Sequence, residues 1–304
     1  MRLSKYVGLK NDFIVTNTKE ITESGFSLGI ESLQEIAKQV CDRNDGIGAD
    51  DLMVLGEIDE TCPGYREFIG TESADCLMYL INPDGSIAEM SGNGSRCFAL
   101  YAREQGYGKT DDQDNYTLKM ATLAGLKTIT YKVVEDNRFY GKTDMDVPIF
   151  EADQIPLENS DAELKVEVLG KERISYAVNT GIPHWVIPLD SQDELNSDAL
   201  IEQGLALRYD KRFPANTNVN FIYIKNDKKI FGRTFERGVG ETFACGTGIT
   251  AMVATQYKEK QVQNICEVQT NGGLATVEID KASGKAFLNA PMNKIGDIEF
   301  CIKK

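Results

Sequence analysis

"EMSGNGSRCFALYAREQG", residues 89–106, joins a glycine-rich turn to a run of apolar residues at helical spacing. The later stretch "ETFACGTGITAMVATQ", residues 241–256, has nearly the same form. Ser91 stands at the head of the first turn, and Cys245 stands at the head of the second. Two similar turn-and-helix stretches predict a duplicated architecture in which a serine and a cysteine hold equivalent places.

The rest of the chain is typical of short strands, rich in β-branched and aromatic residues and bounded by Gly, Asn, Asp or Pro. The predicted strands are 12–17, 51–58, 75–82, 117–122, 126–134, 164–170, 175–181, 184–190, 218–225, 266–273 and 274–280. Two more helices are predicted, one at 197–210 and one at 32–41, where Ser32 and Glu35 fit a capping box. Each half therefore has several strands and a helix after a glycine-rich turn, which indicates a weak internal repeat.

Length and charge narrow the class of protein. The chain has 304 residues, enough for two domains with separate cores. Residues 143–156 are acidic and poor in periodicity, which predicts a domain boundary there and a small-molecule site between the domains.

The net charge of −14 argues against binding to nucleic acid or to an anionic membrane. No apolar run is typical of a signal peptide or a membrane span, so we expect a cytoplasmic protein.

The cysteines do not form a metal-binding or disulfide pattern. There are seven at irregular spacing, without a C-x-x-C pair, and His184 is the single histidine. Neither a zinc site nor a disulfide framework is therefore expected. Most of these thiols are expected to be small buried apolar groups.

Cys245 has a different setting, because a predicted helix begins directly after it. The first N–H groups of a helix are unpaired and carry partial positive charge, so they can hold a carboxylate and lower the pKa of a thiol. The turn at Ser91 offers a second anion site of the same kind. A thiol beside a carboxylate site suits removal of a proton from the carbon next to that carboxylate.

Six segments together resemble the diaminopimelate epimerase family over almost the whole chain. They are "KYVGLKNDFIV" (5–15), "CDRNDGIGADDLMVL" (41–55), "INPDGSIAEMSGNGSRCFA" (81–99), "TGIPHWV" (180–186), "FPANTNVNF" (213–221) and "ERGVGETFACGTG" (236–248). The resemblance implies two similar domains, 1–142 and 143–291, with a C-terminal strand at 292–304 that returns to the first. Each domain would be a mostly antiparallel set of strands curled around a central helix.

The resemblance also implies a reaction, the conversion of LL-2,6-diaminopimelate to the meso form in lysine and cell-wall precursor synthesis. No cofactor is used, pyridoxal phosphate included. One thiolate removes the α-proton, and a second thiol delivers a proton to the opposite face. The partner is thus a small molecule, and a homodimer would fit the family.

The resemblance assigns roles to individual residues at the positions that match the family's motifs. Cys245 matches one catalytic thiol, and Ser91 stands where the other is expected. Gly92, Asn93, Gly246 and Thr247 match the turns that hold the reacting carboxylate. The residues that match ligands of the amino and distal carboxylate groups are Asn11, Asn82, Asn218 and Arg237. Glu236 and His184 match polar neighbours that tune the thiols, and Glu236 also lies among the substrate-binding positions.

Two positions depart from the family pattern. Ile182 occupies a place where many members carry a substrate-binding Asn, a contact that Asn179 or Thr180 could supply instead. Ser91 is the larger departure, because an alcohol is a poor proton donor or acceptor for carbon. The chain is therefore either a natural one-thiol variant or one in which serine replaces a cysteine, and we expect strongly reduced activity. Two alternatives stay open: a related racemase of another amino acid, such as histidine, and a catalytically silent amino-acid binding protein.

Overall fold

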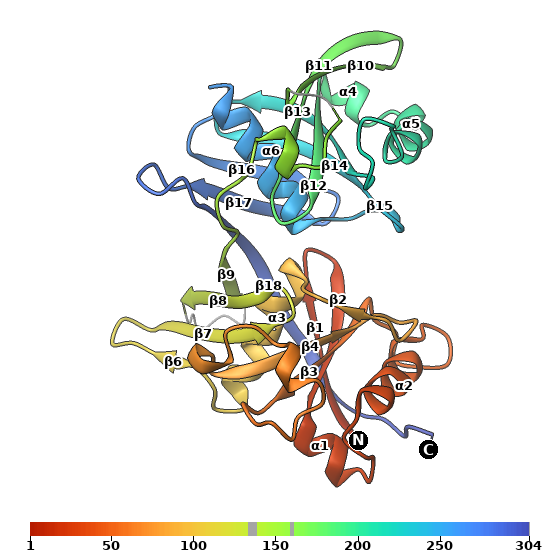
Figure 1. The fold of residues 1–304 in the computed structure, drawn as a ribbon, viewed down its shortest axis with the longest axis vertical. Coiled ribbons are helices and arrows are strands. Elements are labelled where there is room, and N and C mark those ends of the chain that lie inside the picture. Colours follow the sequence, from red (N-terminus) through yellow and green to blue (C-terminus); the bar gives the residue numbers. More distant parts are fainter. Residues whose placement is uncertain (133–138, 159–160, 304) are drawn as a thin grey trace. The chain divides into compact units, whose positions relative to one another are not determined.

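The computed structural model describes residues 1–132, 139–158 and 161–303. It separates into two compact units (Figure 1). Unit 1 comprises Met1–Thr143 and Pro291–Lys304, and unit 2 comprises Asp144–Ala290. The chain therefore passes from one unit to the other twice. Residues 133 and 134, at the end of the predicted strand 126–134, lie outside the described residues.

Unit 1 is a ring of strands around one helix. Its helices are α1 (Thr18–Glu23), α2 (Ile30–Cys41) and α3 (Gly92–Glu104), with short 3-10 turns η1 (Tyr65–Glu67) and η2 (Thr71–Ser73). Its strands are β1 (Arg2–Gly8), β2 (Asn11–Asn17), β3 (Asp51–Gly56), β4 (Cys76–Ile81), β5 (Ile87–Ala88), β6 (Lys109–Thr110), β7 (Asn115–Thr122), β8 (Gly125–Lys132), β9 (Phe139–Asp144) and most of β18 (Ala286–Glu299). Pairings run β1–β2–β3–β4–β7–β8–β9–β18 and return to β1, which closes the ring.

Unit 2 has the same kind of elements. Its helices are α4 (Gln192–Leu195), α5 (Ala199–Leu207) and α6 (Gly246–Lys258), with one 3-10 turn, η3 (Ala152–Gln154). Its strands are β10 (Glu163–Val168), β11 (Lys171–Asn179), β12 (Pro183–Leu189), β13 (Asn218–Asn226), β14 (Lys229–Glu236), β15 (Gly240–Thr242), β16 (Ile265–Thr270), β17 (Gly273–Ile279) and the start of β18.

The two units repeat one topology. In unit 1, β2 and β3 pair in parallel, and the chain that connects them contains α1 and α2. The strands β4 and β7 also pair in parallel, and their connection contains α3. In unit 2, β12 and β13 pair in parallel, and the chain that connects them contains α4 and α5. The strands β14 and β16 also pair in parallel, and their connection contains α6. The neighbouring pairs β1–β2, β3–β4, β11–β12 and β13–β14 are antiparallel. The internal repeat and the two-domain α/β (α+β) fold class predicted from the sequence are confirmed.

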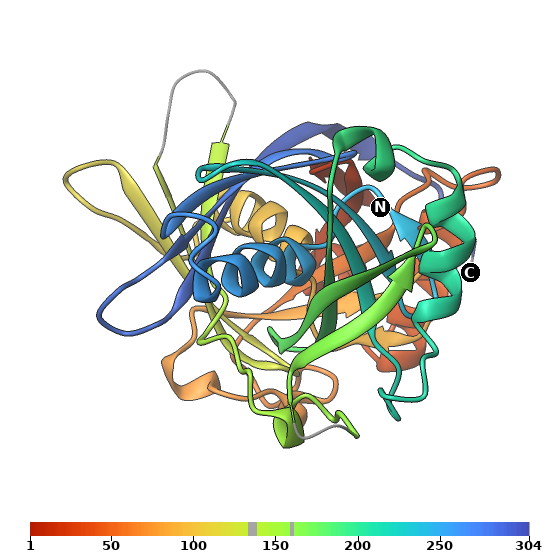
Figure 2. The ribbon, with the colours of Figure 1, turned by 90° about the horizontal axis from the view of Figure 1, so that it is seen from above.

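α3 and α6 are the central helices of their units, and each lies among its own unit's strands in Figure 2. Both have 13 residues and are buried on nearly every side. A helix that is apolar or small-sided all round belongs in a core rather than at a surface. The core of unit 1 accordingly packs Phe98, Ala99 and Ala102 of α3 against Tyr6, Phe13 and other strand side chains.

The start of α2 differs from the prediction. The helix begins at Ile30 after Gly29, which makes no side-chain capping bond, so the capping box assigned to Ser32 and Glu35 is wrong. The Ser32 hydroxyl instead lies 3.1 Å from that of Ser27. The added first turn contains one apolar side chain, Ile30, which packs half-buried against the core of unit 1. Among the described residues, no helix is long and apolar enough to cross a membrane.

Candidate functional site

Ser91 and Cys245 occupy the same position in the two units, the N-cap of the central helix. Ser91 has φ −130° and ψ 123°, and Cys245 has φ −124° and ψ 118°. The Ser91 Oγ accepts a hydrogen bond of 3.0 Å from the N–H of Gly94. Gly248 is the equivalent third helical residue after Cys245, and its N–H lowers the pKa of the thiol without forming a capping hydrogen bond. The two turns therefore place a hydroxyl and a thiol in matching backbone settings.

The third helical residue is glycine in both turns because the side chains approach closely. A Cβ on Gly94 would lie 3.0 Å from the Ser91 Cβ and 3.1 Å from the Met53 Sδ. A Cβ on Gly248 would lie 2.6 Å from the Asn220 Oδ1 and 3.3 Å from the Cys245 Cβ. These contacts explain the shared glycine in "SGNG" and "CGTG".

In unit 1, hydrogen bonds connect Asn93 on the turn with Asn11 at the start of β2. The Asn93 Nδ2 donates to the Asn11 Oδ1 at 2.6 Å, and the Asn11 Nδ2 donates to the Asp50 Oδ2 at 3.0 Å. The Asn93 Oδ1 in turn accepts from Arg96 at 2.5 Å. Because Arg can only donate and a carboxylate can only accept, the orientation of both amides is fixed. Arg96 and Asp50 were not predicted as site residues.

Asn82 lies in a turn after β4 and is not joined to this chain of amides by any hydrogen bond among the described residues. Its Nδ2 donates to the Ser86 Oγ at 2.8 Å, and its backbone N–H donates to the Ser86 carbonyl at 2.9 Å. The side chain is half-buried. Its role in binding stays a prediction.

In unit 2, four side chains form a directed line of hydrogen bonds that ends on the thiol. The Asn220 Nδ2 lies 3.0 Å from the His184 Nδ1, and the His184 Nε2 lies 2.9 Å from the Thr247 Oγ1. The Thr247 Oγ1 lies 3.2 Å from the Cys245 Sγ. Asn220 was missed by the sequence reading, although it is two residues from Asn218 on one strand and so lies on the same face.

The directions in this line follow from its end. The Asn220 Nδ2 also donates to the Trp185 carbonyl at 3.4 Å, and because a carbonyl only accepts, the nitrogen of this amide is the atom that faces His184, while its Oδ1 accepts from the Thr234 hydroxyl at 3.0 Å. The Nδ1 of His184 is therefore an acceptor, and its Nε2 carries the proton and donates to Thr247. Thr247 then has its own hydroxyl proton free to donate to the sulfur. The arrangement favours a negative charge on Cys245.

His184 is neutral in this setting. It is fully buried, and burial together with the positive charge of Arg237 lowers its pKa from 6.5 to about 3. Between these values the unfolded chain binds more protons than the folded one. His184 therefore stabilises the fold above pH 6.5, and this contribution is lost as the pH falls toward 3.

A titration of the imidazole tests this assignment. Because the chain has one histidine, its ring nitrogens give an unambiguous NMR signal. We expect a neutral ring protonated on Nε2 through the neutral and mildly acidic range, with a midpoint near 3. In the matched variant Asn220→Asp, the new carboxylate accepts from Nδ1, so the proton should move to Nδ1 and the pKa should rise. A ring that titrates near 6.5 in the unsubstituted protein contradicts the assignment.

The pKa of Cys245 is raised, whereas the sequence analysis expected a lowered one. Burial is the largest cause, and the carboxylate of Glu236 adds to it, while Thr247 and the N–H of Gly248 act in the opposite direction. The Glu236 Oε1 also accepts from the Thr242 hydroxyl at 2.6 Å. The prediction considered the helix terminus and omitted desolvation of the sulfur. Cys245 is therefore a protonated thiol at neutral pH.

Asn218 and Arg237 retain unused hydrogen-bond donors. The Asn218 Oδ1 accepts from the backbone N–H of Arg237 at 2.8 Å, whereas its buried Nδ2 has no partner. The Arg237 guanidinium donates from Nη1 to the Ala215 carbonyl at 2.9 Å. No carboxylate of the described residues forms an ion pair with Arg237. A buried donor without an acceptor costs free energy, so Asn218 is placed to receive a ligand oxygen.

The two residues considered as substitutes for the missing Asn at position 182 are engaged elsewhere. The Thr180 hydroxyl donates to the Thr247 carbonyl at 3.0 Å. The Asn179 Nδ2 donates to the Gln154 carbonyl at 2.8 Å, and its Oδ1 accepts from the N–H of Gly181 at 3.0 Å. Ile182 itself is half-buried. Neither side chain therefore replaces the Asn without first breaking a bond.

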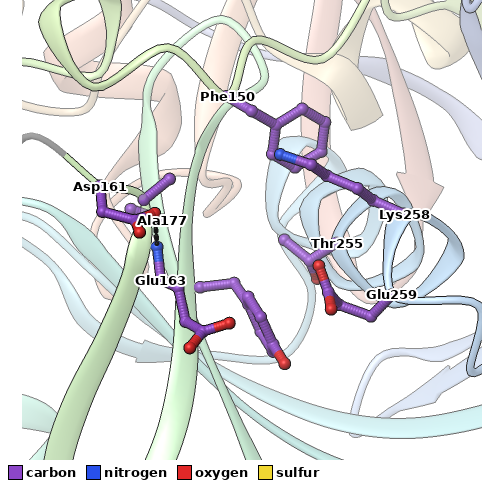
Figure 3. A pocket seen from close by; sticks show the side chains of 9 residues that line it. Phe150, Asp161, Glu163, Ala177, Thr255, Lys258 and Glu259 are labelled. Carbon is purple, nitrogen blue, oxygen red and sulfur yellow. Dashed lines mark hydrogen bonds between the residues drawn. The ribbon is translucent and has the colours of Figure 1, made fainter.

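A separate pocket of about 180 Å³ lies elsewhere in unit 2 (Figure 3). Its lining includes the carboxylates of Asp161, Glu163 and Glu259, with Lys258 placed over the ring of Phe150 at 4.1 Å. None of the predicted site residues lines it.

The family profile and the relatives found by sequence agree on one family. The profile described as "Diaminopimelate epimerase" matches residues 3–150 and 176–294. The diaminopimelate epimerase of Archaeoglobus fulgidus is 32% identical, over 97% of this chain and 94% of that protein. That of Methanothrix thermoacetophila is 37% identical, over 94% of this chain and 91% of that protein. A Bacillus anthracis phenazine biosynthesis protein of the PhzF family shares the fold at a TM-score of 0.63 and 18% identity, with 99% of each chain covered.

Proposed function

Because the chain belongs to the diaminopimelate epimerase family, we propose that it binds 2,6-diaminopimelate and acts at its α-carbon. The reaction class is epimerisation from the LL to the meso form, without a cofactor. The observation that carries this proposal is the duplicated N-cap. Cys245 and Ser91 stand at equivalent helix starts in two units of one topology. Each turn offers unpaired N–H groups to an anion.

In the proposed mechanism, N–H groups at a helix start hold the α-carboxylate, and the groups at positions 91 and 245 are the base and the acid of a two-base reaction. A base on one face takes the α-proton, and the electron pair of the C–H bond stays on the carbon as a carbanion. An acid on the other face then gives its proton to that carbon. Hydrogen-bond donors preorganised around the carboxylate stabilise the negative charge that develops there.

The surroundings of Cys245 suit both halves of such a cycle. Burial and Glu236 keep the resting thiol protonated, so that it can act as the acid. Once the proton has left, the line from Asn220 through His184 to Thr247 donates a hydrogen bond to the sulfur. The base is then required at position 91, where a serine hydroxyl is a poor acceptor for a carbon-bound proton. This chain should therefore bind substrate and turn it over slowly.

The distal end of the substrate is assigned to Arg237 and Asn218. Arg237 has guanidinium N–H groups left for a bidentate grip on a carboxylate, and the unpartnered Nδ2 of Asn218 adds one donor. Asn11 and Asn82 are assigned to the amino group and the rest of the substrate. A second charged end favours diaminopimelate over amino acids that carry a single carboxylate.

Two other functions remain as alternatives. Ile182, with its apolar side chain, favours a racemase of another amino acid such as histidine. Ser91, whose hydroxyl already caps α3, favours a silent amino-acid binding protein. The first differs from the main proposal in substrate, and the second differs in whether a thiol at position 91 restores turnover.

Calorimetric titration of the unsubstituted protein with LL-diaminopimelate, meso-diaminopimelate and L-histidine separates the substrate classes. We expect saturable binding of diaminopimelate and at least tenfold weaker binding of histidine, because only diaminopimelate presents a second carboxylate to Arg237. Cys301→Ser, at an exposed thiol outside the site, serves as the control and should bind like the parent. Tighter binding of histidine than of either diaminopimelate isomer contradicts the assignment.

A further inference from the structure

Arg96 is a buried cation without a counter-ion in the part of the chain that the structure describes. Its side chain is fully buried in unit 1, on α3. It donates to two neutral acceptors, the Gly92 carbonyl at 2.8 Å and the Asn93 Oδ1 at 2.5 Å, and its Nε has no partner. Among the described residues, no carboxylate forms an ion pair with it. Burial lowers the pKa of Arg96 to about 10, so it is charged at neutral pH.

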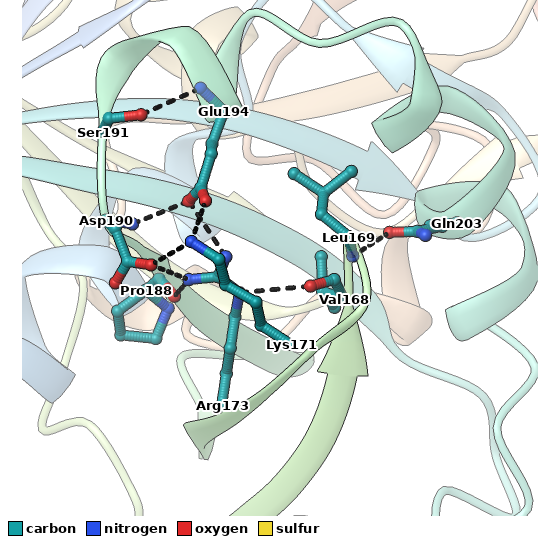
Figure 4. A network of polar contacts seen from close by, with 9 residues as sticks. All are labelled: Val168, Leu169, Lys171, Arg173, Pro188, Asp190, Ser191, Glu194 and Gln203. Carbon is teal, nitrogen blue, oxygen red and sulfur yellow. Dashed lines mark hydrogen bonds and ion pairs between the residues drawn. The ribbon is translucent and has the colours of Figure 1, made fainter.

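A second buried arginine of the same chain has carboxylate partners. Arg173 in unit 2 is also buried, and its guanidinium lies 2.9 Å from Glu194 and 3.4 Å from Asp190, with Lys171 joining both carboxylates (Figure 4). Arg173 is thus the internal comparison for Arg96. Burying a charge without a partner costs far more free energy than burying a paired one. We therefore expect the charge of Arg96 to be compensated by a group that is not part of the free protein.

The place of Arg96 in unit 1 is fixed. The acceptors of its guanidinium belong to the first two helical residues after Ser91, so the charge lies beside the turn that is proposed to hold the α-carboxylate. The aliphatic part of the side chain lies against β9. A Cβ on Gly141 would come within 2.9 Å of the Arg96 Cδ and 3.0 Å of its Cγ. The strand therefore leaves the side chain little freedom to turn toward another partner.

We propose that the anion missing beside Arg96 is the substrate's α-carboxylate, and that Arg96 is a positioning residue for it. Arg96 acts through the turn without touching the substrate. Its charge strengthens the attraction of the turn for the carboxylate and for the negative charge that the carbanion delocalises onto it. Its bond to the Asn93 Oδ1 also holds that amide in the orientation that continues to Asn11. The inference rests on the proposed function.

The stability of an Arg96→Met variant distinguishes this role from a structural one. Methionine fills the space and removes the charge, so the proposal predicts a melting temperature equal to or above that of the parent. The affinity for diaminopimelate, measured by calorimetric titration, should fall at least tenfold. Arg173→Met is the matched control. It leaves Glu194 and Asp190 without their partner, so it should lower the melting temperature and leave the affinity within twofold of the parent.

Arg96→Lys separates charge from hydrogen-bond geometry. Lysine keeps the positive charge, so its loss of affinity should be clearly smaller than that of Arg96→Met. An Arg96→Met protein that binds diaminopimelate within twofold of the parent overturns the inference. So does one that fails to fold, because the proposal holds that the fold does not need this charge. Equal losses in the Lys and Met variants overturn it as well. A parent that binds no diaminopimelate overturns the proposed function, and the inference with it.

Discussion

Ser91→Cys is expected to raise the rate of diaminopimelate epimerisation by roughly 10²–10⁴-fold, the usual contribution of one positioned acid or base. The thiol has a pKa of about 8.5 before any influence of the site, whereas that of an alcohol lies far higher. Cysteine thus supplies the acceptor that the serine at the head of α3 lacks. The measurement is the rate at which LL-diaminopimelate becomes the meso form, with incorporation of solvent deuterium at the α-carbon as a second signal.

The control for this prediction is Cys245→Ser in the Ser91→Cys background, which should remove the gain. The substitution at position 91 also exchanges a good helix cap for a weaker one, because the Ser91 Oγ accepts from Gly94. A loss of about 0.5–2 kcal/mol in the free energy of unfolding is therefore expected beside the gain in rate. Rates that agree within a few-fold for the serine and cysteine proteins would show that position 91 does not hold the missing base.

Arg237→Lys is expected to weaken binding of diaminopimelate by about 1.5–3 kcal/mol, or roughly 10- to 150-fold in Kd. Lysine keeps the charge but cannot form two parallel hydrogen bonds to one carboxylate. The effect should be largest for diaminopimelate and small for amino acids without a distal carboxylate, which calorimetric titration can resolve.

Arg212→Lys provides the comparison within the same unit, because Arg212 is bonded to Asp210 and to the Lys165 carbonyl. That variant should bind diaminopimelate like the parent. An Arg237→Lys protein with unchanged affinity would make Arg237 a structural residue, held by its bond to the Ala215 carbonyl. The assignment of a substrate with a second carboxylate would then lose its main support.

The central helices and their caps could be predicted from the sequence because several local signals coincide there. A glycine-rich turn, a polar or thiol side chain before it and a helical period after it all indicate the same boundary, and α3 and α6 begin at Gly92 and Gly246. The six family segments then fixed the fold class. The strand β1 was not predicted, because it is recognisable only through its pairing with β18 far along the chain, and a strand at 292–304 was expected from the resemblance alone.

The electrostatic character of the site could not be predicted in the same way. The raised pKa of Cys245 depends on burial and on the position of Glu236, which only the packed structure provides. The missing counter-ion of Arg96 is likewise a property of its surroundings, since "GNGSRC" gives no sign that the arginine faces inward. Asn220 had a usable signal in the spacing of "NVN", but its role depends on His184 lying next to it.

The return of residues 291–304 to unit 1 has a consequence for how the protein is made. β1 is synthesised long before its partner strand β18, in which Glu299 lies opposite Arg2. Unit 2 is continuous in sequence and can fold as soon as it is synthesised. Unit 1 precedes it in the chain but must wait with an unpaired strand edge until the later part of β18 has been synthesised. During that interval β1 is open to misdirected pairing with other chains.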